Sequence, residues 1–380
     1  MRDFELEKHF SKWEFEARHH MTASDAESMS VNELISLVGP AARDDLLDCW
    51  LGYTETRGAP DLRDAIAQTY DVCGPDDIQC FVGIEEGIYA AMRVMLGAGD
   101  HAIVTVPNYQ AAESLPLDIC DVSGVPLLPE EGWRLDLEAL RSAIQPNTKL
   151  VSVNFPNNPT GAIPDHATLN ELIALCRKHG LWLFSDEVYR MMELEPERRA
   201  PQIADVYERG ISVNVMSKAY GLPGLRIGWA ACRNKGLLAE LERYRHYLSI
   251  CSSAPSERLA VAALGARDRI LARNLEIVRE NRAKLDSFFS GYPELFDWQH
   301  PDGGCVAFPR YLGADGVEDF CRNIVETEGV LLLPASIYRS DLLATPTDRF
   351  RIGMGRRGID DGLEAMRRFI ERRGNIAGDR

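Results

Sequence analysis

The chain has 380 residues, 45% of them hydrophobic and 26% charged, which is enough for one large or two medium domains with a sizeable core. Its 58 acidic residues exceed its 42 basic residues and give a formal net charge of −16. A charge of this sign repels phosphate backbones and anionic lipids. We therefore expect small-molecule ligands, with no nucleic-acid and no membrane partner.

The sequence shows no sign of a targeting segment or of a disulfide framework. No apolar run reaches the roughly 18–20 residues of a membrane span, and the opening Met1-Arg2-Asp3-Phe4-Glu5 is too acidic for a signal peptide. The nine cysteines are scattered and include no CxxC pair, which is typical of reduced thiols and not of a zinc site. These features predict a cytoplasmic protein without a metal site.

Apolar strands and amphipathic helices alternate through the middle of the chain. We expect strands at residues 81–82, 102–106, 150–155, 181–184, 211–216 and 227–232. Helices are predicted at 85–96 and from Asp165 to the residue before Gly180. Short apolar strands separated by helices indicate a parallel sheet covered on both faces, whose ligands bind at the carboxyl ends of the strands.

The pattern changes after Cys251 and predicts a second, smaller unit. We expect a long helix at 267–289, strands at 306–308 and 349–352, and a helix at 317–328. The predicted fold class is therefore α/β, with a large domain of mostly parallel sheet covered by helices and a smaller α+β domain formed by the two chain ends. The expected boundaries are 46–272 for the large domain, and 1–45 with 273–380 for the small one.

Four polar residues follow the predicted strands and suggest a site for an aldehyde cofactor. Such a cofactor needs a lysine amine for a Schiff base and a carboxylate for a pyridine nitrogen. Lys218 comes just after strand 211–216, and Asp186 follows strand 181–184 with Tyr189 three residues later. Asn158 is a possible donor to a phenolic oxygen. Taken singly, Lys218 is more typical of a surface lysine, whereas Asp186, Tyr189 and Asn158 are also compatible with a helix cap, a packed aromatic and a turn.

A phosphate group would find donors at the start of the helix predicted at 85–96. The segment Gly83-Ile84-Glu85 opens this helix directly after a strand, where free N–H groups and the helix dipole attract anions. Arg226, eight residues after Lys218, would add a positive charge. A lone glycine at such a place is weak evidence by itself.

Six motifs in a fixed order make the pattern specific. They are Tyr53-x4-Gly58-x3-Leu62-Arg63, Pro107-x-Tyr109, Asn157-Asn158-Pro159-Thr160-Gly161, Ser185-Asp186-Glu187-Val188-Tyr189, Ser217-Lys218-x5-Gly224-Leu225-Arg226-Ile227-Gly228, and Arg351. Together they resemble the class I and II aminotransferases of the pyridoxal-phosphate (PLP) fold type I superfamily, over about residues 50 to 355.

The resemblance implies a role for each cofactor residue. Lys218 would form the Schiff base, Asp186 would pair with the ring nitrogen, and Asn158 with Tyr189 would bind the ring hydroxyl. Stacking on the ring would fall to Tyr109. The phosphate would be held by Arg226, Ser217 and the amides of Gly83, Ile84 and Glu85.

The same resemblance implies a substrate contact and an oligomer. Arg351, with Asn158 beside it, would bind the substrate α-carboxylate through its guanidinium fork. Tyr53 would reach the phosphate of a neighbouring subunit, so the protein is expected to be a homodimer with shared active sites. The implied activity is that of an aminotransferase, which moves an amino group between an amino acid and a 2-oxo acid.

Two departures from the family pattern keep a second activity open. Val215 stands where the family usually has a hydroxyl that touches the phosphate. Residues 22–34 lack the usual glycine-containing stretch and look more like the subgroup containing capreomycidine synthase, which eliminates a β-hydroxyl from a hydroxyarginine and cyclises the product. The alternative activity is therefore a PLP-dependent lyase or cyclase. Asp25, Glu27 or Glu33 would then line the pocket for a cationic side chain, although a solvated acidic surface segment explains these residues at least as well.

Overall fold

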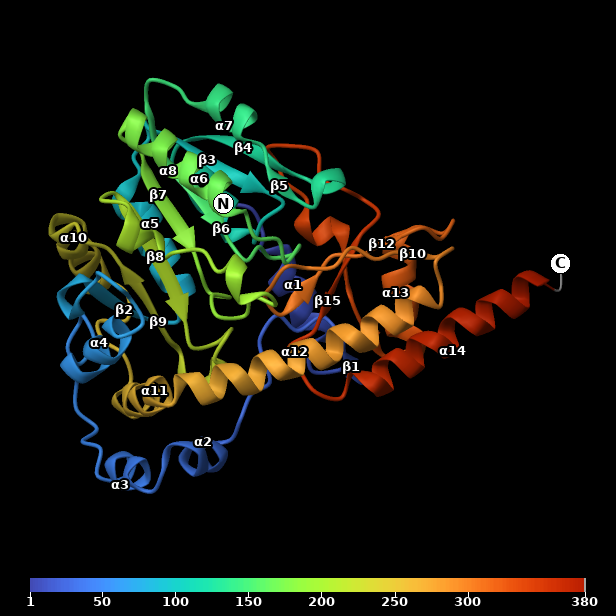
Figure 1. Cartoon of the computed structure of the whole chain (residues 1–380), viewed down its shortest axis with the longest axis horizontal. Helices are drawn as coiled ribbons and strands as arrows, with labels where there is room; N and C mark the ends of the chain where they lie inside the picture. Colours follow the sequence, from blue (N-terminus) through green and yellow to red (C-terminus); the bar gives the residue numbers. More distant parts are fainter. Residues whose placement is uncertain (379–380) are drawn as a thin grey trace.

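An eight-stranded sheet forms the centre of the computed structural model, which describes residues 1–378 (Figure 1). Its strands lie in the order β2 (Ile78–Val82), β9 (Ile227–Ala231), β8 (Gly210–Val215), β7 (Trp182–Asp186), β6 (Thr148–Asn154), β3 (His101–Val106), β4 (Asp121–Leu128) and β5 (Arg134–Leu135). Strands β8, β7, β6, β3 and β4 are parallel. The α/β class with a mostly parallel sheet is confirmed.

Two strands depart from the predicted pattern. Strand β9 runs antiparallel to both of its neighbours. The eleven residues from β8 to β9 form a loop and a short turn, which is too little chain for the crossover that a parallel neighbour needs. Strand β4 was missed because Asp121, Gly124 and Pro126 interrupt its apolar run.

Side chains alternate between the two faces of the sheet, and each face has its own helical cover. Phe81 and Phe184 point into one hydrophobic cluster, whereas their neighbours Cys80 and Leu183 belong to the other. The first face is covered by α5 (Ile84–Met95), α6 (Ala111–Leu117) and α10 (Lys235–Arg245). The second is covered by α4 (Pro60–Ala67), α7 (Leu137–Ala143), α8 (His166–His179), α9 (Ile203–Val206) and α11 (Ala254–Gly265).

The C-terminal third adds a second set of small sheets and long helices. A three-stranded antiparallel sheet has β15 (Phe350–Gly353) between β11 (Val306–Ala307) and β14 (Leu333–Pro334). A further antiparallel pair joins β10 (Phe296–Asp297) and β12 (Arg310–Tyr311). Around them pack α12 (Arg267–Ser290), α13 (Val317–Glu328) and α14 (Ile359–Gly378), with α12 and α14 side by side in Figure 1.

The first 45 residues are shared between the two parts of the molecule. Strand β1 (His19–His20) pairs with β13 (Val330–Leu331) of the C-terminal part. Helices α2 (Val31–Val38) and α3 (Ala41–Leu47) instead contact α11. The expected boundary at residue 272 falls inside α12, so the division into 46–272 and the two chain ends stays a prediction. Among residues 1–378, no helix has both the length and the apolar character needed to span a bilayer.

Candidate active site

A cavity of about 280 Å³ opens at the carboxyl ends of the parallel strands. Strand β7 ends at Asp186, and the loop after β8 carries Lys218, so the sheet brings both residues to one edge. Both residues line the cavity, together with seven other residues from the predicted site. These seven are Ile84, Glu85, Tyr109, Asn158, Tyr189, Ser217 and Arg226.

The Lys218 amine is held at the centre of this cavity. Its Nζ donates a hydrogen bond of 2.8 Å to the hydroxyl oxygen of Ser24. Burial lowers the pKa of the Lys218 ammonium, Asp25 opposes this effect, and Arg351 adds to it. A lysine with a lowered pKa carries more of the neutral amine at neutral pH, which is the form able to attack a carbonyl or accept a proton.

Asp186 is a half-buried carboxylate that faces the same space. Burial raises the pKa of its carboxyl to about 6, although the hydrogen bond from the Val188 N–H and the charge of Lys218 oppose the rise. No arginine or lysine forms an ion pair with it among residues 1–378. A cationic ring nitrogen would therefore stabilise its charged form.

An anion cradle lies at the start of helix α5. A Cβ atom on Gly83 would come within 2.2 Å of Arg226 Nη2, and Gly83 has a φ of +76°. A Cβ on Gly228 would meet the backbone nitrogen of Ile84 at 2.7 Å. The two glycines thus let the guanidinium and the first N–H groups of α5 approach one point.

The side chain of Ser217 lies on the same side of the cavity as this cradle. Its hydroxyl is 3.5 Å from Arg226 Nη1. Val215 also lines the cavity. Its side chain carries only methyl groups, so it cannot supply the hydroxyl that the family usually has at this position. A hydroxyl near Arg226 is thus supplied by Ser217.

Tyr109 and Tyr189 form two aromatic walls. The Tyr189 hydroxyl donates 2.8 Å to the carbonyl oxygen of Ser24, and burial raises the pKa of its phenol. Burial likewise raises the pKa of Glu85 to about 7; Asp186 adds to this rise and a hydrogen bond with Tyr109 opposes it. The carboxyl group of Glu85, and not only its predicted amide, therefore faces the cavity.

Arg351 lies behind Asn158 and does not itself line the cavity. It is fully buried on β15. Its guanidinium donates to Asn158 Oδ1 at 3.2 Å, and to the hydroxyl and carbonyl oxygens of Thr22 at 3.2 and 2.7 Å. All three acceptors are neutral, and no acidic side chain pairs with Arg351 within residues 1–378. A buried charge without a counter-ion is costly, so this place favours an anion.

Arg356 is a second arginine that lines the cavity, besides Arg226, and it is not among the residues that the sequence motifs single out. Its Nε and Nη2 bind the two oxygens of Asp25, both at 2.9 Å. Asp25 is thus already neutralised. Glu27 accepts the backbone N–H of Arg357, and Glu33 caps helix α2. Of the three predicted acids, only Asp25 reaches the cavity.

Helix α1 (Glu5–Trp13) supplies a wall that sequence reasoning did not find. Glu7, Phe10 and Glu14 line the cavity from this segment, and His20 does so from β1. Burial raises the pKa of Glu14, although Arg356 opposes the rise. Burial and the nearby Arg356 and Arg351 lower the pKa of His20 to about 4. The alternation of apolar and charged residues in α1 was the one available signal of an amphipathic helix.

Tyr53 lies outside this cavity. Its side chain is 84% exposed, and it stands in the loop between α3 and α4. Within one chain the structure therefore does not bring Tyr53 to the other predicted site residues.

Comparison with known proteins identifies the family of this fold and site. The family model for aminotransferase class I and II matches residues 30–365. The chain belongs to the class I and II aminotransferases. Among curated relatives, capreomycidine synthase of Streptomyces vinaceus is 32% identical over 287 residues, which cover 75% of this chain and 72% of that protein. Arginine–pyruvate transaminase AruH of Pseudomonas aeruginosa is 29% identical, with 78% and 77% covered.

Solved structures of this aminotransferase family agree with the fold over nearly the whole chain. A PLP-dependent aminotransferase from Streptococcus suis is 31% identical with a TM-score of 0.91, and 98% of both chains is covered. The PLP-dependent cyclase OrfR is 27% identical with a TM-score of 0.89 and the same coverage. This aminotransferase-family chain is therefore a PLP-dependent enzyme.

The residues present fit PLP. The lack of a side chain on Gly83 lets the Arg226 guanidinium lie against the start of helix α5, where the free N–H groups of the helix can also bind a phosphate. Lys218 supplies an amine with a lowered pKa, and Asp186 supplies a half-buried carboxylate with a raised pKa and, among residues 1–378, no ion-pair partner. These are the three groups that an aldehyde-bearing pyridine phosphate requires.

Proposed function

We propose that the enzyme is an aminotransferase that moves an amino group from an amino acid to a 2-oxo acid. The observation that carries this proposal is the buried, uncompensated charge of Arg351 directly behind Asn158, at the edge of the Lys218 cavity. Amino acids and 2-oxo acids share one anionic group, the α-carboxylate. A single arginine can therefore orient both substrates over the same lysine.

The residues around the cavity would hold the cofactor in one orientation. Asp186 would pair with its ring nitrogen, Asn158 and Tyr189 would bind its ring hydroxyl, and Tyr109 would stack on its ring. Arg226, Ser217 and the first amides of α5 would hold the phosphate. When bound, PLP supplies an electron sink that stabilises negative charge at the substrate Cα.

Lys218 would move the proton in this reaction. Its amine is neutral more often than that of an ordinary lysine, because burial lowers its pKa. The hydrogen bond to Ser24 fixes the Nζ at a defined place in the cavity. Lys218 would take the proton from the substrate Cα. It would return the proton to the carbon atom on the other side of the transferred nitrogen. The Phe10 ring of α1 lies 5.9 Å from the Arg351 guanidinium and would limit access of water, which strengthens the electrostatic contact to a carboxylate.

The test is the product formed from a panel of amino acids with and without a 2-oxo acid. The panel includes arginine, ornithine, alanine, aspartate and β-hydroxyarginine. An aminotransferase forms the 2-oxo product only when an acceptor is present. Release of ammonia or water without any acceptor would contradict the proposal.

A second candidate is a lyase or cyclase that acts on a β-substituted, hydroxyarginine-like amino acid. A substrate that carries negative charge at Cα can either lose a β-substituent or take up a proton. The residues around the cofactor ring are compatible with both reactions. Two observations favour this candidate. The first is the similarity of the chain to capreomycidine synthase and to the cyclase OrfR. The second is the pair of carboxylates that the α1 segment places on the cavity wall. Glu7 and Glu14 would face a cationic side chain. In the same panel, β-hydroxyarginine would then give a cyclic product without an acceptor.

The raised pKa of Asp186 indicates how cofactor binding should depend on pH. Because the pKa of Asp186 is raised from 3.8 to about 6, its negative charge is lost as the pH falls through 6. Affinity for PLP should then fall by up to tenfold per pH unit below that value. The PLP phosphate also titrates at about pH 6, so Asp186→Asn is the control. The parent should show the steeper dependence in fluorescence titrations, and equal slopes would contradict the role of Asp186.

We further propose a cytoplasmic homodimer whose sites share Tyr53. Exposed apolar side chains support this assembly, because Trp50 and Tyr53 are exposed in one loop, and Tyr247 and Ile250 are exposed in another. The loops are joined where Thr54 Oγ1 donates 3.1 Å to the Ser252 carbonyl. Solvent exposure of so many large apolar side chains is typical of a surface that another subunit covers. The nine free cysteines support a reducing compartment.

Mixed dimers give the expected result for shared sites. Lys218→Ala and Tyr53→Ala subunits, each of low activity alone, should regain about a quarter of the parent activity after random exchange, because each hybrid has one intact site. A mixture of Lys218→Ala and Arg226→Ala subunits should regain no activity. Each of these substitutions damages the site of the subunit that carries it, so a hybrid dimer has no intact site. Equal recovery in the two mixtures, or a fully active monomer in sedimentation, would refute shared sites.

A further inference from the structure

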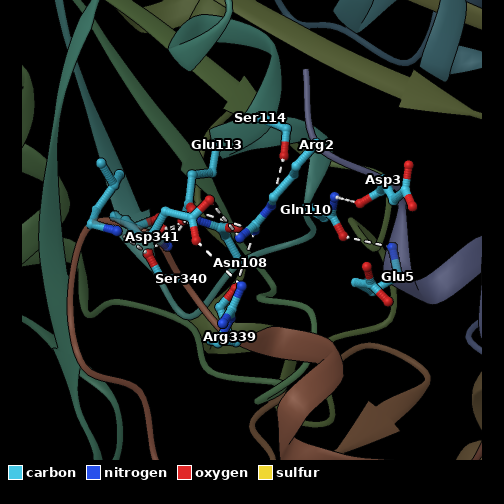
Figure 2. A network of polar contacts seen from close by, with 12 residues as sticks. Arg2, Asp3, Glu5, Asn108, Gln110, Glu113, Ser114, Arg339, Ser340 and Asp341 are labelled. Carbon is cyan, nitrogen blue, oxygen red and sulfur yellow. Dashed lines mark hydrogen bonds and ion pairs between the residues drawn. The ribbon is translucent and has the colours of Figure 1, made fainter.

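A network of polar contacts ties the start of helix α1 and the residues that precede it to distant parts of the chain (Figure 2). The buried side chain of Gln110 makes two hydrogen bonds to this segment. It accepts one of 3.0 Å from the backbone N–H of Glu5 and donates one of 2.7 Å to the carbonyl oxygen of Asp3. The first bond satisfies a helix N–H that has no partner within α1. Phe4, between these two contacts, packs on Tyr109 with ring centroids 5.4 Å apart. The start of α1 is therefore fixed next to a wall of the cavity.

A buried carboxylate anchors the same segment to a distant part of the chain. Glu113 is fully buried, and it accepts 2.6 Å from Ser340 Oγ and 2.8 Å from the Asp341 N–H. Arg2 lies 3.4 Å from Glu113 and 2.9 Å from Asp341 in two ion pairs. Arg2 also donates to the carbonyl oxygen of Arg339 at 3.1 Å. One guanidinium thus joins three segments that are far apart in the sequence, as Figure 2 shows.

The residues of this network do not line the cavity, but the α1 segment that they position does. None of Arg2, Gln110 and Glu113 lines the cavity. Helix α1 leads from them to Phe10, whose ring lies 5.9 Å from the Arg351 guanidinium, and on to Glu14. Residues 1–29 lie outside the family match, so Arg2 and helix α1 are not part of the family model.

We propose that Arg2, Gln110 and Glu113 are positioning residues that hold α1 over the substrate end of the cavity and thereby set the affinity for substrate. The inference rests on the proposed function for the identity of the substrate. Arg2 is partly exposed and α1 buries only Leu6 completely, so α1 can open without unfolding the rest of the chain. Loss of the network should therefore expose Arg351 to water and leave the Lys218 end of the cavity intact.

Three conservative variants test this proposal. Arg2→Gln and Glu113→Gln remove one charge each from the network with little change in shape, and the double variant removes both. Lys8→Gln is the matched control, since Lys8 carries the same charge on α1 itself and contacts only exposed acids. The readouts are amide hydrogen exchange of residues 5–13, KM and kcat for the best amino acid, and the absorbance of bound PLP.

The expected result separates positioning from a merely structural role. Arg2→Gln and Glu113→Gln should speed exchange in α1 and raise KM by about tenfold each, the effect of one lost charge-assisted contact. The kcat and the PLP absorbance should stay within about twofold of the parent, and the double variant should be no worse than either single one. Lys8→Gln should match the parent.

Two outcomes would overturn the proposal. One is unchanged exchange in α1 in both single variants. The other is faster exchange with an unchanged KM, because α1 would then be loose without consequence for the substrate. If no amino acid in the panel reacts with the parent enzyme, the proposed function fails, while the exchange data alone still decide whether the network holds α1.

Discussion

Replacement of Lys218 by alanine is expected to lower kcat by roughly 10²–10⁴-fold from the lost proton relay alone, with a further loss from the missing covalent exchange. The reason is geometric, because Lys218 is the lysine that lines the cavity between Asp186 and the anion cradle. The variant should still bind PLP without a covalent bond, since Asp186 and Arg226 remain. Single-turnover rates and PLP absorbance of the purified variant measure both properties.

Two control variants separate the amine from its surroundings. Ser24→Ala keeps the amine and removes only its 2.8 Å hydrogen bond, so it should lose much less than Lys218→Ala. Lys235→Ala removes an exposed lysine that pairs with Asp77 and should leave kcat unchanged. A Lys218→Ala enzyme within tenfold of the parent would show that another group moves the proton.

Replacement of Arg351 by alanine should reduce kcat/KM for every substrate alike. A charge-assisted contact to a carboxylate is worth about 1.5–3 kcal/mol, which corresponds to roughly ten- to a few hundredfold. Arg351→Lys should recover part of the loss, because lysine keeps the charge and lacks the bidentate fork. Steady-state rates for a chemically varied set of amino acids provide the measurement.

The matched control is Arg349→Lys, since Arg349 is also buried but stacks over Trp133 at 4.8 Å, away from the cavity. It should leave kcat/KM close to that of the parent. If Arg351→Ala altered the preference among side chains and spared the rate common to all substrates, Arg351 would not be the α-carboxylate contact. Arg356 would then be the next candidate, although Asp25 occupies its fork.

Much of the large sheet and its ligand edge was predictable, because both depend on local patterns. The helices at α5, α8, α12 and α13 follow from apolar periodicity and from end signals such as Asp165 and Gly180, and the structure places them within one or two residues of the prediction. Parallel strands end at one edge of a sheet, so the placement of Lys218 near Asp186 follows once the strands are identified.

The parts that were not predictable depend on contacts between distant segments. Helix α1 is too short to be stable alone, and its contribution to the cavity depends on Gln110 and Glu113, about 105 to 111 residues away. The neutralisation of Asp25 depends on Arg356, which is 331 residues away. The orientation of β9 depends on the loop that carries Lys218 and not on the composition of the strand.

The proposed role of Lys218 requires one covalent bond, between its amine and PLP. Borohydride reduction of the purified enzyme followed by peptide mapping locates such a bond. We expect the reduced cofactor on the peptide that contains Ser217 and Lys218, and we expect it to be absent from this peptide in Lys218→Ala. Recovery of the cofactor on any other lysine, or of no covalent cofactor from a PLP-saturated enzyme, would contradict this role.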